Sequence, residues 1–194
     1  TSPEATVAHA CEAAHRGVAV MVGTTGLNDH QRQKLQECAA KVPLLIAANT
    51  SVGVNLIFRV AAEIAATLGD EYDIEIIEAH HRFKKDAPSG TALRLAEEIA
   101  AATGRHLADN AVYGRHGISG ERPSKEIGIH AVRAGDIVGE HTVIYSTLGE
   151  RIELTHRAHT RDTFVRGAIR AARFLVRQKP GLYTMRDVVA ELGI

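Results

Sequence analysis

The segment from Glu75 to Ala92, EIIEAHHRFKKDAPSGTA, holds the densest group of chemically active side chains in this chain of 194 residues. Two adjacent histidines, two adjacent lysines and an aspartate fall within seven positions, from His80 to Asp86. The ordinary pKa of histidine lies near neutrality, and a lysine beside other cations can give up a proton, so both residue types serve in acid–base catalysis. The segment therefore predicts a site that moves a proton.

The elements on either side of this segment must position its side chains. Residues 73–78 have the apolar pattern of a strand, which places His80 and His81 at or just beyond its carboxyl end. Pro88 ends the extended stretch, and Ser89-Gly90-Thr91 opens an amphipathic helix. A strand end, a charged loop and a helix start are therefore predicted to meet at one place.

The start of that helix is a ready anion site. Its first backbone N–H groups lack partners within the helix, the dipole is positive there, and Gly90 lets a ligand approach the backbone. Lys84, His80 and His81 would add donors, so the expected ligand is a small carboxylate or phosphate compound. The alternative is a polar loop with histidines that cap the strand and solvated lysines, but so many polar residue types at one junction favour a site.

Composition limits the classes of partner. Hydrophobic residues make up 45% of the chain, enough for a core in one large domain or two small ones. Lysine plus arginine and aspartate plus glutamate number 23 each, so no net field favours nucleic acid or an anionic membrane. No signal peptide is visible, and no apolar run approaches the roughly 18 residues of a membrane helix. We expect neither nucleic-acid nor membrane partners.

The cysteines and the other histidines give no sign of a metal. Cys11 and Cys38 lack C-x-x-C spacing and fit reduced, buried thiols of a cytoplasmic protein. His156 and His159 are three positions apart, yet no cysteine or acid completes a ligand set. His80 and its neighbour would point to opposite sides of a strand, which is poor geometry for one metal. We expect no metal site.

The first 50 residues predict one crossover unit of a doubly wound parallel sheet. Ser2 is a good N-cap for a helix, and Asn28, with Gln31 three positions on, is a good N-cap for a second helix. All-apolar stretches, typical of buried parallel strands, are expected to form strands at 18–22 and 42–48. The loops GTTG and AANTS follow these strands, and loops at the carboxyl ends of such strands are candidates for cofactor contact.

The middle of the chain predicts an α+β arrangement. Helices are expected at 54–68 and 91–103, a strand at 73–79, a long loop at 105–123, and extended runs at 126–133, 137–147 and 151–158. The short connections 134–136 and 148–150 predict hairpins, so the three runs should be antiparallel neighbours. With the strand at 73–79 they would form a mixed sheet covered on one face by the two helices. Helical spacing returns at 161–177 and at 185–192.

The segment EIIEAHHRFKKDAPSGTA resembles the signature of the 4-hydroxy-tetrahydrodipicolinate reductases, also called dihydrodipicolinate reductases. The resemblance implies nicotinamide-dependent reduction of a cyclic dicarboxylate in lysine and diaminopimelate biosynthesis. It implies that His80 donates or accepts a proton and that Lys84 donates one. The substrate-binding residues would be His81, Ser89, Gly90 and Thr91. Lys85 falls where the family has no fixed residue, so it receives no role.

The resemblance also implies a cofactor site and a domain organisation. The nicotinamide side of NADPH or NADH would be lined by Gly23, Thr24, Thr25, Ala47, Ala48, Asn49 and Thr50. Residues 1–50 and 161–194 would be part of a Rossmann-like dinucleotide-binding domain. Residues 51–160 would be a substrate-binding domain whose mixed sheet assembles a homotetramer.

The chain lacks the G-x-G-x-x-G-like turn that opens a dinucleotide-binding domain, and the residue that reads the cofactor ribose. In the resembled family this segment would precede Thr1, so we expect the chain to correspond to the C-terminal two-thirds of the enzyme. The strand at 18–22 should then have an unpaired edge, and cofactor binding by this chain alone should be weak or absent.

The mechanistic hypothesis places the substrate carboxylates on the amides of residues 89–91, His81 and Lys84. His80 or Lys84 would supply the proton that balances hydride transfer, and both donors stay open at this point. A Schiff-base lyase with Lys84 as nucleophile is an alternative, although it leaves the GTTG and AANTS loops without a use. The other alternative is a non-catalytic fragment that binds a dicarboxylate or forms oligomers.

Overall fold

The computed structural model describes residues 2–193 of the chain and divides into two compact units. The first unit combines the residues up to 55 with those from 162 onward, and the second is the continuous segment 56–161.

The first unit is a three-stranded parallel sheet with helices on both faces. In chain order its elements are α1 (Pro3–His15), β1 (Val20–Val22), α2 (Asp29–Ala39), β2 (Pro43–Ile46), α6 (Asp162–Leu175), β8 (Gly181–Tyr183) and α7 (Met185–Ala190). The strand order is β1-β2-β8, so β1 is an edge strand within the described part of the chain. The predicted parallel crossover is confirmed.

Side-chain caps explain where three helices of this unit begin. The Ser2 hydroxyl accepts a hydrogen bond from the backbone of α1, and Asn28 and Gln31 form a reciprocal capping box on α2, as predicted. Thr184 and Asp187 form a second capping box on α7. The strand β8 was not predicted, because only Gly181–Tyr183 pairs with β2 and so short a stretch has no readable alternation.

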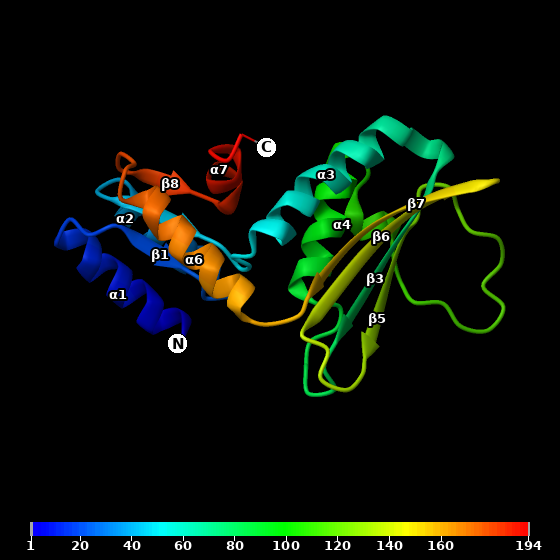
Figure 1. Ribbon diagram of the computed structural model, residues 1–194, viewed down its shortest axis with the longest axis horizontal. Helices are drawn as coiled ribbons and strands as arrows, with labels where there is room; N and C mark the ends of the chain where they lie inside the picture. The colour runs from blue at the N-terminus through cyan, green and yellow to red at the C-terminus, as the bar shows by residue number, and fades with distance from the viewer. Residues whose placement is uncertain (1, 194) are drawn as a thin grey trace. The chain divides into compact units, whose positions relative to one another are not determined.

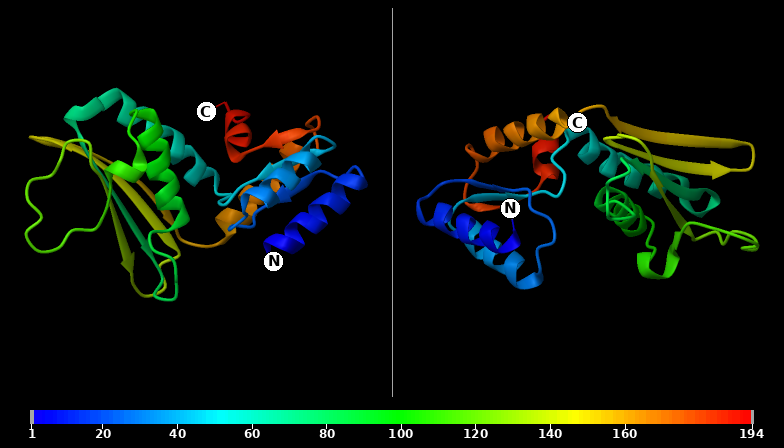
Figure 2. Two further views of the ribbon diagram at one scale, coloured as in Figure 1. Left: turned by 180° about the vertical axis from the view of Figure 1, so that it is seen from behind. Right: turned by 90° about the horizontal axis from the view of Figure 1, so that it is seen from below.

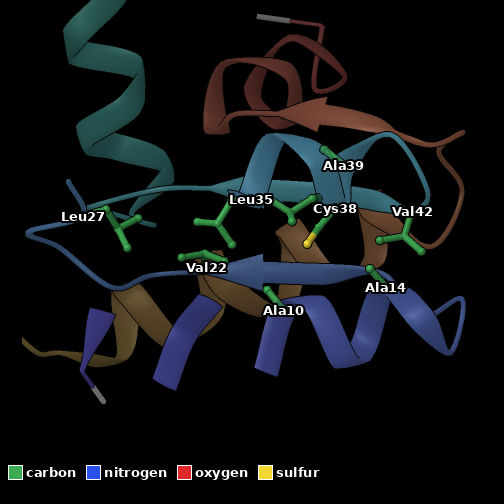
Figure 3. Packing of buried hydrophobic residues seen from close by; sticks show 9 residues of the cluster. Ala10, Ala14, Val22, Leu27, Leu35, Cys38, Ala39 and Val42 are labelled. Atoms are coloured by element: carbon green, nitrogen blue, oxygen red, sulfur yellow. The ribbon is translucent and has the colours of Figure 1, made fainter. Parts of the chain in front are cut away.

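The two faces of this sheet bury different side chains of the same strands. Val22 and Leu44 pack against α1 and α2, with Leu35 and Cys38 at the centre of that cluster (Figure 3). Leu45 points the opposite way and packs against α6 and α7. Burial on both faces explains why these strands are almost continuously apolar.

The second unit is a five-stranded mixed sheet with helices on one face. Its elements are α3 (Val52–Leu68, which starts in the first unit), a 3₁₀ turn (Gly69–Glu71), β3 (Asp73–His80), α4 (Gly90–Ala102), α5 (Leu107–Asn110), β4 (Ala111–Tyr113), β5 (Ile127–Arg133), β6 (Gly139–Thr147) and β7 (Glu150–Ala158). The strand order is β4-β5-β3-β6-β7. The predicted α/β class and the mixed sheet are confirmed.

The prediction that the first two extended runs form a hairpin is wrong. β3 lies between β5 and β6, pairing in parallel with β5 and antiparallel with β6. The connection between those strands passes over the end of β3, where the Ala134 N–H donates to the His80 carbonyl at 3.0 Å and the Arg82 N–H donates to the Gly135 carbonyl at 3.1 Å. The second predicted hairpin, between β6 and β7, is correct.

The prediction of an unbroken loop at 105–123 is also wrong in part. The short helix α5 and the edge strand β4 interrupt it, and β4 pairs in parallel with β5. The remainder, from Gly114 to the start of β5, runs as a long loop beyond the sheet (Figure 2). A three-residue edge strand carries too little hydrophobic pattern to be read from sequence.

Alternation along the strands separates a covered face from an open face. α3 and α4 lie over one face of this sheet, as Figure 1 shows. Ile74 and Ile76 of β3 are buried beneath these helices, and the Tyr145 hydroxyl of β6 donates to the Ala61 carbonyl of α3 at 2.7 Å. Each such buried aliphatic side chain stabilises the unit by roughly 1.5–3 kcal/mol. On the open face, which carries Ile77 and Val132, these two side chains remain 38% and 44% exposed.

α3 with its 3₁₀ extension, Val52–Glu71, is long and apolar enough to cross a membrane by length and composition alone. One side of it packs within the unit, where Ala61 and Ala65 are buried, and 28% of the residues in its most apolar window are buried. On its solvent side, Arg59 and Glu63 form an ion pair at 3.6 Å.

Candidate functional site

The carboxylate of Glu78 is the centre of the site at the end of β3. It is completely buried and accepts four hydrogen bonds. Arg133 of β5 donates two of them, at 2.7 and 2.8 Å, the backbone N–H of Ser89 donates one at 3.0 Å, and Nδ1 of His80 is the fourth partner at 2.6 Å. Glu78 therefore joins the strand end, the neighbouring strand and the start of α4.

The hydrogen bonds around Glu78 influence the ionisation of both Glu78 and His80. Burial alone would raise the pKa of Glu78, but the hydrogen bonds from Arg133, His80 and the Ser89 N–H outweigh it and hold this pKa below its usual range. Burial is the main reason that the pKa of His80 lies below its ordinary value, and Glu78 opposes that shift. The site therefore holds an ionised carboxylate beside a histidine whose pKa is lowered by burial.

The start of α4 forms as the sequence predicts. Ser89 is the N-cap, and its hydroxyl accepts a hydrogen bond from the Ala92 N–H at 3.1 Å. The Ser89 N–H is committed to Glu78, so it is not among the amides that a ligand can use. Gly90 is exposed, and a Cβ built on it would meet no atom within 4 Å, which leaves open space over the helix start.

The charged loop between β3 and α4 carries the other predicted residues. Nζ of Lys84 lies 2.8 Å from both carboxylate oxygens of Asp86, and its hydrogen bond holds the pKa of Asp86 below the usual range. Nδ1 of His81 is buried without a hydrogen-bond partner among residues 2–193. Lys85 is exposed.

Three residues of this site were missed by the sequence reasoning: Glu78, Arg133 and His141. His141 of β6 is 4% exposed, lies 2.9 Å from the Ser89 hydroxyl through Nε2, and its ring centroid is 5.2 Å from that of His80. Burial lowers the pKa of His141 to about 3, with His80 adding to the shift. Of the three, only Glu78 has a signal in the sequence that could have identified it. The strand alternates so that Ile74 and Ile76 face the covered side, and an acid at the next position of that row is unusual.

The seven residues expected to contact a cofactor lie in two loops of the first unit. The backbone joins these loops at their start, because the Ala47 N–H donates to the Val22 carbonyl at 2.9 Å. Gly23, Thr24 and Thr25 help to line a hollow of about 670 Å³ beside β1. In the second loop, the Thr50 hydroxyl donates to the Phe164 carbonyl at 2.7 Å.

Contacts with other parts of the same unit hold the second loop in place. The Asn49 carbonyl accepts a hydrogen bond from the Asn55 side chain at 2.9 Å, and Ala48 is exposed. A Cβ on Gly167 of α6 would lie 1.8 Å from the Thr50 carbonyl oxygen, so only glycine allows α6 to approach this loop so closely.

The structure thus brings His80, Ser89 and Gly90 together around Glu78 in the second unit, with Lys84 and His81 on the adjoining loop. The predicted cofactor loops belong to the first unit. Within residues 2–193 no group of three or more histidine, cysteine, aspartate or glutamate side chains is arranged to hold a metal ion. The expectation of no metal stays a prediction.

The fold and site define a class of two-unit α/β proteins, with a parallel sheet that offers strand-end loops and a mixed sheet in which a histidine-bearing strand end lies beside an exposed helix start. Family models described as "Dihydrodipicolinate reductase, N-terminus" and "Dihydrodipicolinate reductase, C-terminus" match residues 1–50 and 53–189. The chain therefore belongs to the dihydrodipicolinate reductase family.

Individual relatives agree with this assignment. A 4-hydroxy-tetrahydrodipicolinate reductase of Hahella chejuensis is 57% identical over 189 residues, which are 97% of this chain and 71% of that protein. The corresponding enzyme of Syntrophus aciditrophicus is 54% identical, over 97% of this chain and 70% of that protein. Among solved structures, dipicolinate-bound dihydrodipicolinate reductase from Paenisporosarcina sp. TG-14 superposes with a TM-score of 0.76 at 27% identity, covering 95% of this chain and 69% of that one.

Proposed function

We propose that this chain carries out the substrate-binding and proton-transfer part of the nicotinamide-dependent reduction of 4-hydroxy-tetrahydrodipicolinate to tetrahydrodipicolinate, a step of lysine and diaminopimelate biosynthesis. The observation that carries the proposal is the open helix start at Gly90, bordered by His80 on β3 and the loop with Lys84. Relatives more than 50% identical are named as this reductase, which supports the same substrate here.

The substrate carboxylates bind at the start of α4 in this proposal. The amides of Gly90 and Thr91 and the positive end of the helix dipole attract an anion. His81 and the Lys84 ammonium add donors from the loop. Ser89 contributes by capping the helix and not by direct contact with the substrate, because its N–H is held by Glu78 and its buried hydroxyl bonds the Ala92 N–H and His141.

The proton comes from His80 or Lys84. Both side chains are partly buried, at 12% and 21% exposure, so each can meet a bound substrate without full hydration. A hydride from NADPH or NADH completes the reduction, and the loops with Gly23, Thr24, Thr25, Ala47, Ala48, Asn49 and Thr50 would hold the nicotinamide end. No residue of these loops indicates which of the two cofactors is used.

The contact with Asp86 argues against the lyase alternative. A lysine that forms a Schiff base must be a neutral amine, whereas Nζ of Lys84 is paired with both oxygens of an ionised carboxylate. Failure of borohydride to trap a substrate adduct on Lys84 is the expected result.

Steady-state kinetics of the His80→Ala and Lys84→Ala variants test the proposal. Each change should lower kcat by more than about tenfold with the fold intact, since a positioned acid typically contributes roughly 10²- to 10⁴-fold. Lys85→Ala is the matched control, since Lys85 is exposed and should leave kcat unchanged. An unchanged kcat in both test variants would show that neither His80 nor Lys84 is the proton donor. Dicarboxylate binding by the unmodified chain without any turnover would identify a non-catalytic fragment.

The proposed assembly is a cytoplasmic homotetramer formed through the open face of the mixed sheet. Support comes from Ile77 and Val132, which stay partly exposed in the middle of that face.

A further inference from the structure

We propose that Glu78, held by Arg133, is the positioning residue for His80, fixing the imidazole with a hydrogen on Nδ1 and so making Nε2 the atom that exchanges a proton with substrate. This inference rests on the proposed reductase function and assigns an atom within the same site. Glu78 itself touches no substrate.

The hydrogen-bond chemistry of Glu78 fixes the tautomer. An ionised carboxylate can only accept, and each oxygen of Glu78 already has two donors. Oε1 accepts from Nη2 of Arg133 and from the Ser89 N–H, while Oε2 accepts from Nη1 of Arg133 and from Nδ1 of His80. Nδ1 of His80 must therefore carry a hydrogen, and in the neutral ring the lone pair lies on Nε2.

On the opposite side of the ring, Nε2 lies close to a glycine, which leaves it room that a side chain would fill. This atom makes no hydrogen bond within the described chain, and it faces Gly139, the first residue of β6. A Cβ on Gly139 would lie 3.1 Å from Nε2, closer than ordinary van der Waals contact. When the imidazolium gives up its Nε2 proton to the substrate, it becomes the neutral Nδ1–H ring, and water then returns a proton to Nε2.

The same carboxylate connects this ring to the rest of the site. Glu78 holds the start of α4 through the Ser89 N–H, and Nη2 of Arg133 also donates to the Asp86 carbonyl at 2.7 Å in the loop that carries Lys84. One buried ion pair therefore sets the relative positions of the proton donor, the anion site and the charged loop. Both oxygens of Glu78 are fully hydrogen-bonded, which is the condition for a buried charge to be tolerated, whereas Nε of Arg133 is buried without a partner among residues 2–193.

The charged groups around His80 give the sign of the expected pH effect. Arg133 on β5, Lys84 on the loop and His141 on β6 face the ring, and Asp86 is paired with Lys84. Glu78 is the group that favours the protonated ring, since its hydrogen bond and its charge both act in that direction. Without the anion the ring is left among cations, so His80 should be protonated only at lower pH.

Nitrogen-15 NMR of the histidine rings in the ligand-free chain tests the proposal. In the unmodified chain neutral His80 should carry its hydrogen on Nδ1. In Glu78→Gln the titration midpoint of His80 should fall by about one pH unit and the Nδ1–H form should lose its dominance. Glu75→Gln is the matched control, because Glu75 lies on the same strand, points to the open face and also binds arginines.

Two more variants keep the test decisive. Gly139→Ala should keep the tautomer and the midpoint but weaken dipicolinate binding at least tenfold, because its methyl group crowds Nε2. If Glu78→Gln does not fold, Glu78→Asp should still reduce the Nδ1–H population, because the shorter side chain withdraws the carboxylate from Nδ1 of His80. A hydrogen on Nε2 of neutral His80, or an unchanged midpoint and tautomer in the folded Glu78→Gln chain, would overturn the proposal, and dipicolinate binding would report separately on the proposed function.

Discussion

Gly90 is the residue at which access to the anion site can be tested apart from folding. It is exposed, and a Cβ there would meet nothing within 4 Å. Alanine is a better helix residue than glycine by roughly 1 kcal/mol, so Gly90→Ala should leave the melting temperature unchanged or slightly higher. Its methyl group would stand where the substrate carboxylate meets the amides.

We therefore expect Gly90→Ala to bind dipicolinate at least about tenfold more weakly while remaining fully folded, a loss of about 1.4 kcal/mol in binding. Calorimetric titration and thermal unfolding measure the two effects separately. An equal dissociation constant for the variant and the unmodified chain would show that the carboxylate does not bind at this helix start.

The residues of the site differ in how easily sequence analysis identifies them. His80, Lys84 and Gly90 can be identified from the sequence by their residue types and their spacing within one short segment. Glu78 and Arg133, separated by 55 positions, meet only because β5 pairs with β3. A partner that strand pairing brings in from a distant segment leaves no pattern in the local sequence. The buried hydrogen bonds between Glu78, Arg133 and His80 could therefore be found only in the structure.

Glu75 gives the open face of the mixed sheet a dependence on pH. Burial would raise the pKa of Glu75, but Arg115, Arg122 and His130 outweigh it and lower this pKa to about 2. A carboxyl whose folded-state pKa is depressed contributes stability above its unfolded pKa and loses it as pH falls through the folded value. The stability from Glu75 should therefore be complete above about pH 4.5 and disappear by about pH 2.

Denaturant unfolding at several pH values between 7 and 2 measures this effect. The difference between the unmodified chain and Glu75→Gln should be at most about 3 kcal/mol near neutrality and should shrink toward zero at the acid end. A difference that stays constant with pH would show that the network does not depend on ionised Glu75.

Among the elements, helices were predicted better than strand pairing. The caps at Ser2, Asn28 and Ser89 are local signals, and all three mark helix starts in the structure. The pairing of β3 between β5 and β6 depends on contacts between distant segments, which a short connection such as 134–136 does not reveal. β4 and β8 were too short to show a period.

At the scale of the whole molecule, the two units differ in how the chain builds them. The segment 56–161 forms the second unit without interruption, whereas the first unit needs both ends of the chain, joined by the pairing of β2 with β8. The mixed sheet is covered by helices on one face, and its open face is where we expect copies of the chain to meet.

A charge placed on the open face tests the proposed assembly. Val132→Glu should reduce a homotetramer to smaller species in analytical ultracentrifugation, because burying an unpaired carboxylate in an interface is costly. Dipicolinate binding per chain should persist, since Val132 points away from the covered face that holds Glu78. Tetramers of unchanged stability would place the interface elsewhere.

The central claim is that the end of β3 and the start of α4 form a dicarboxylate site. Calorimetric titration of this chain with dipicolinate, followed by nicotinamide cofactor in the same cell, tests it most directly. We predict saturable binding with one site per chain that Lys84→Ala abolishes and Lys85→Ala preserves. Absence of dipicolinate binding, or equal binding by the Lys84→Ala chain, would contradict the account.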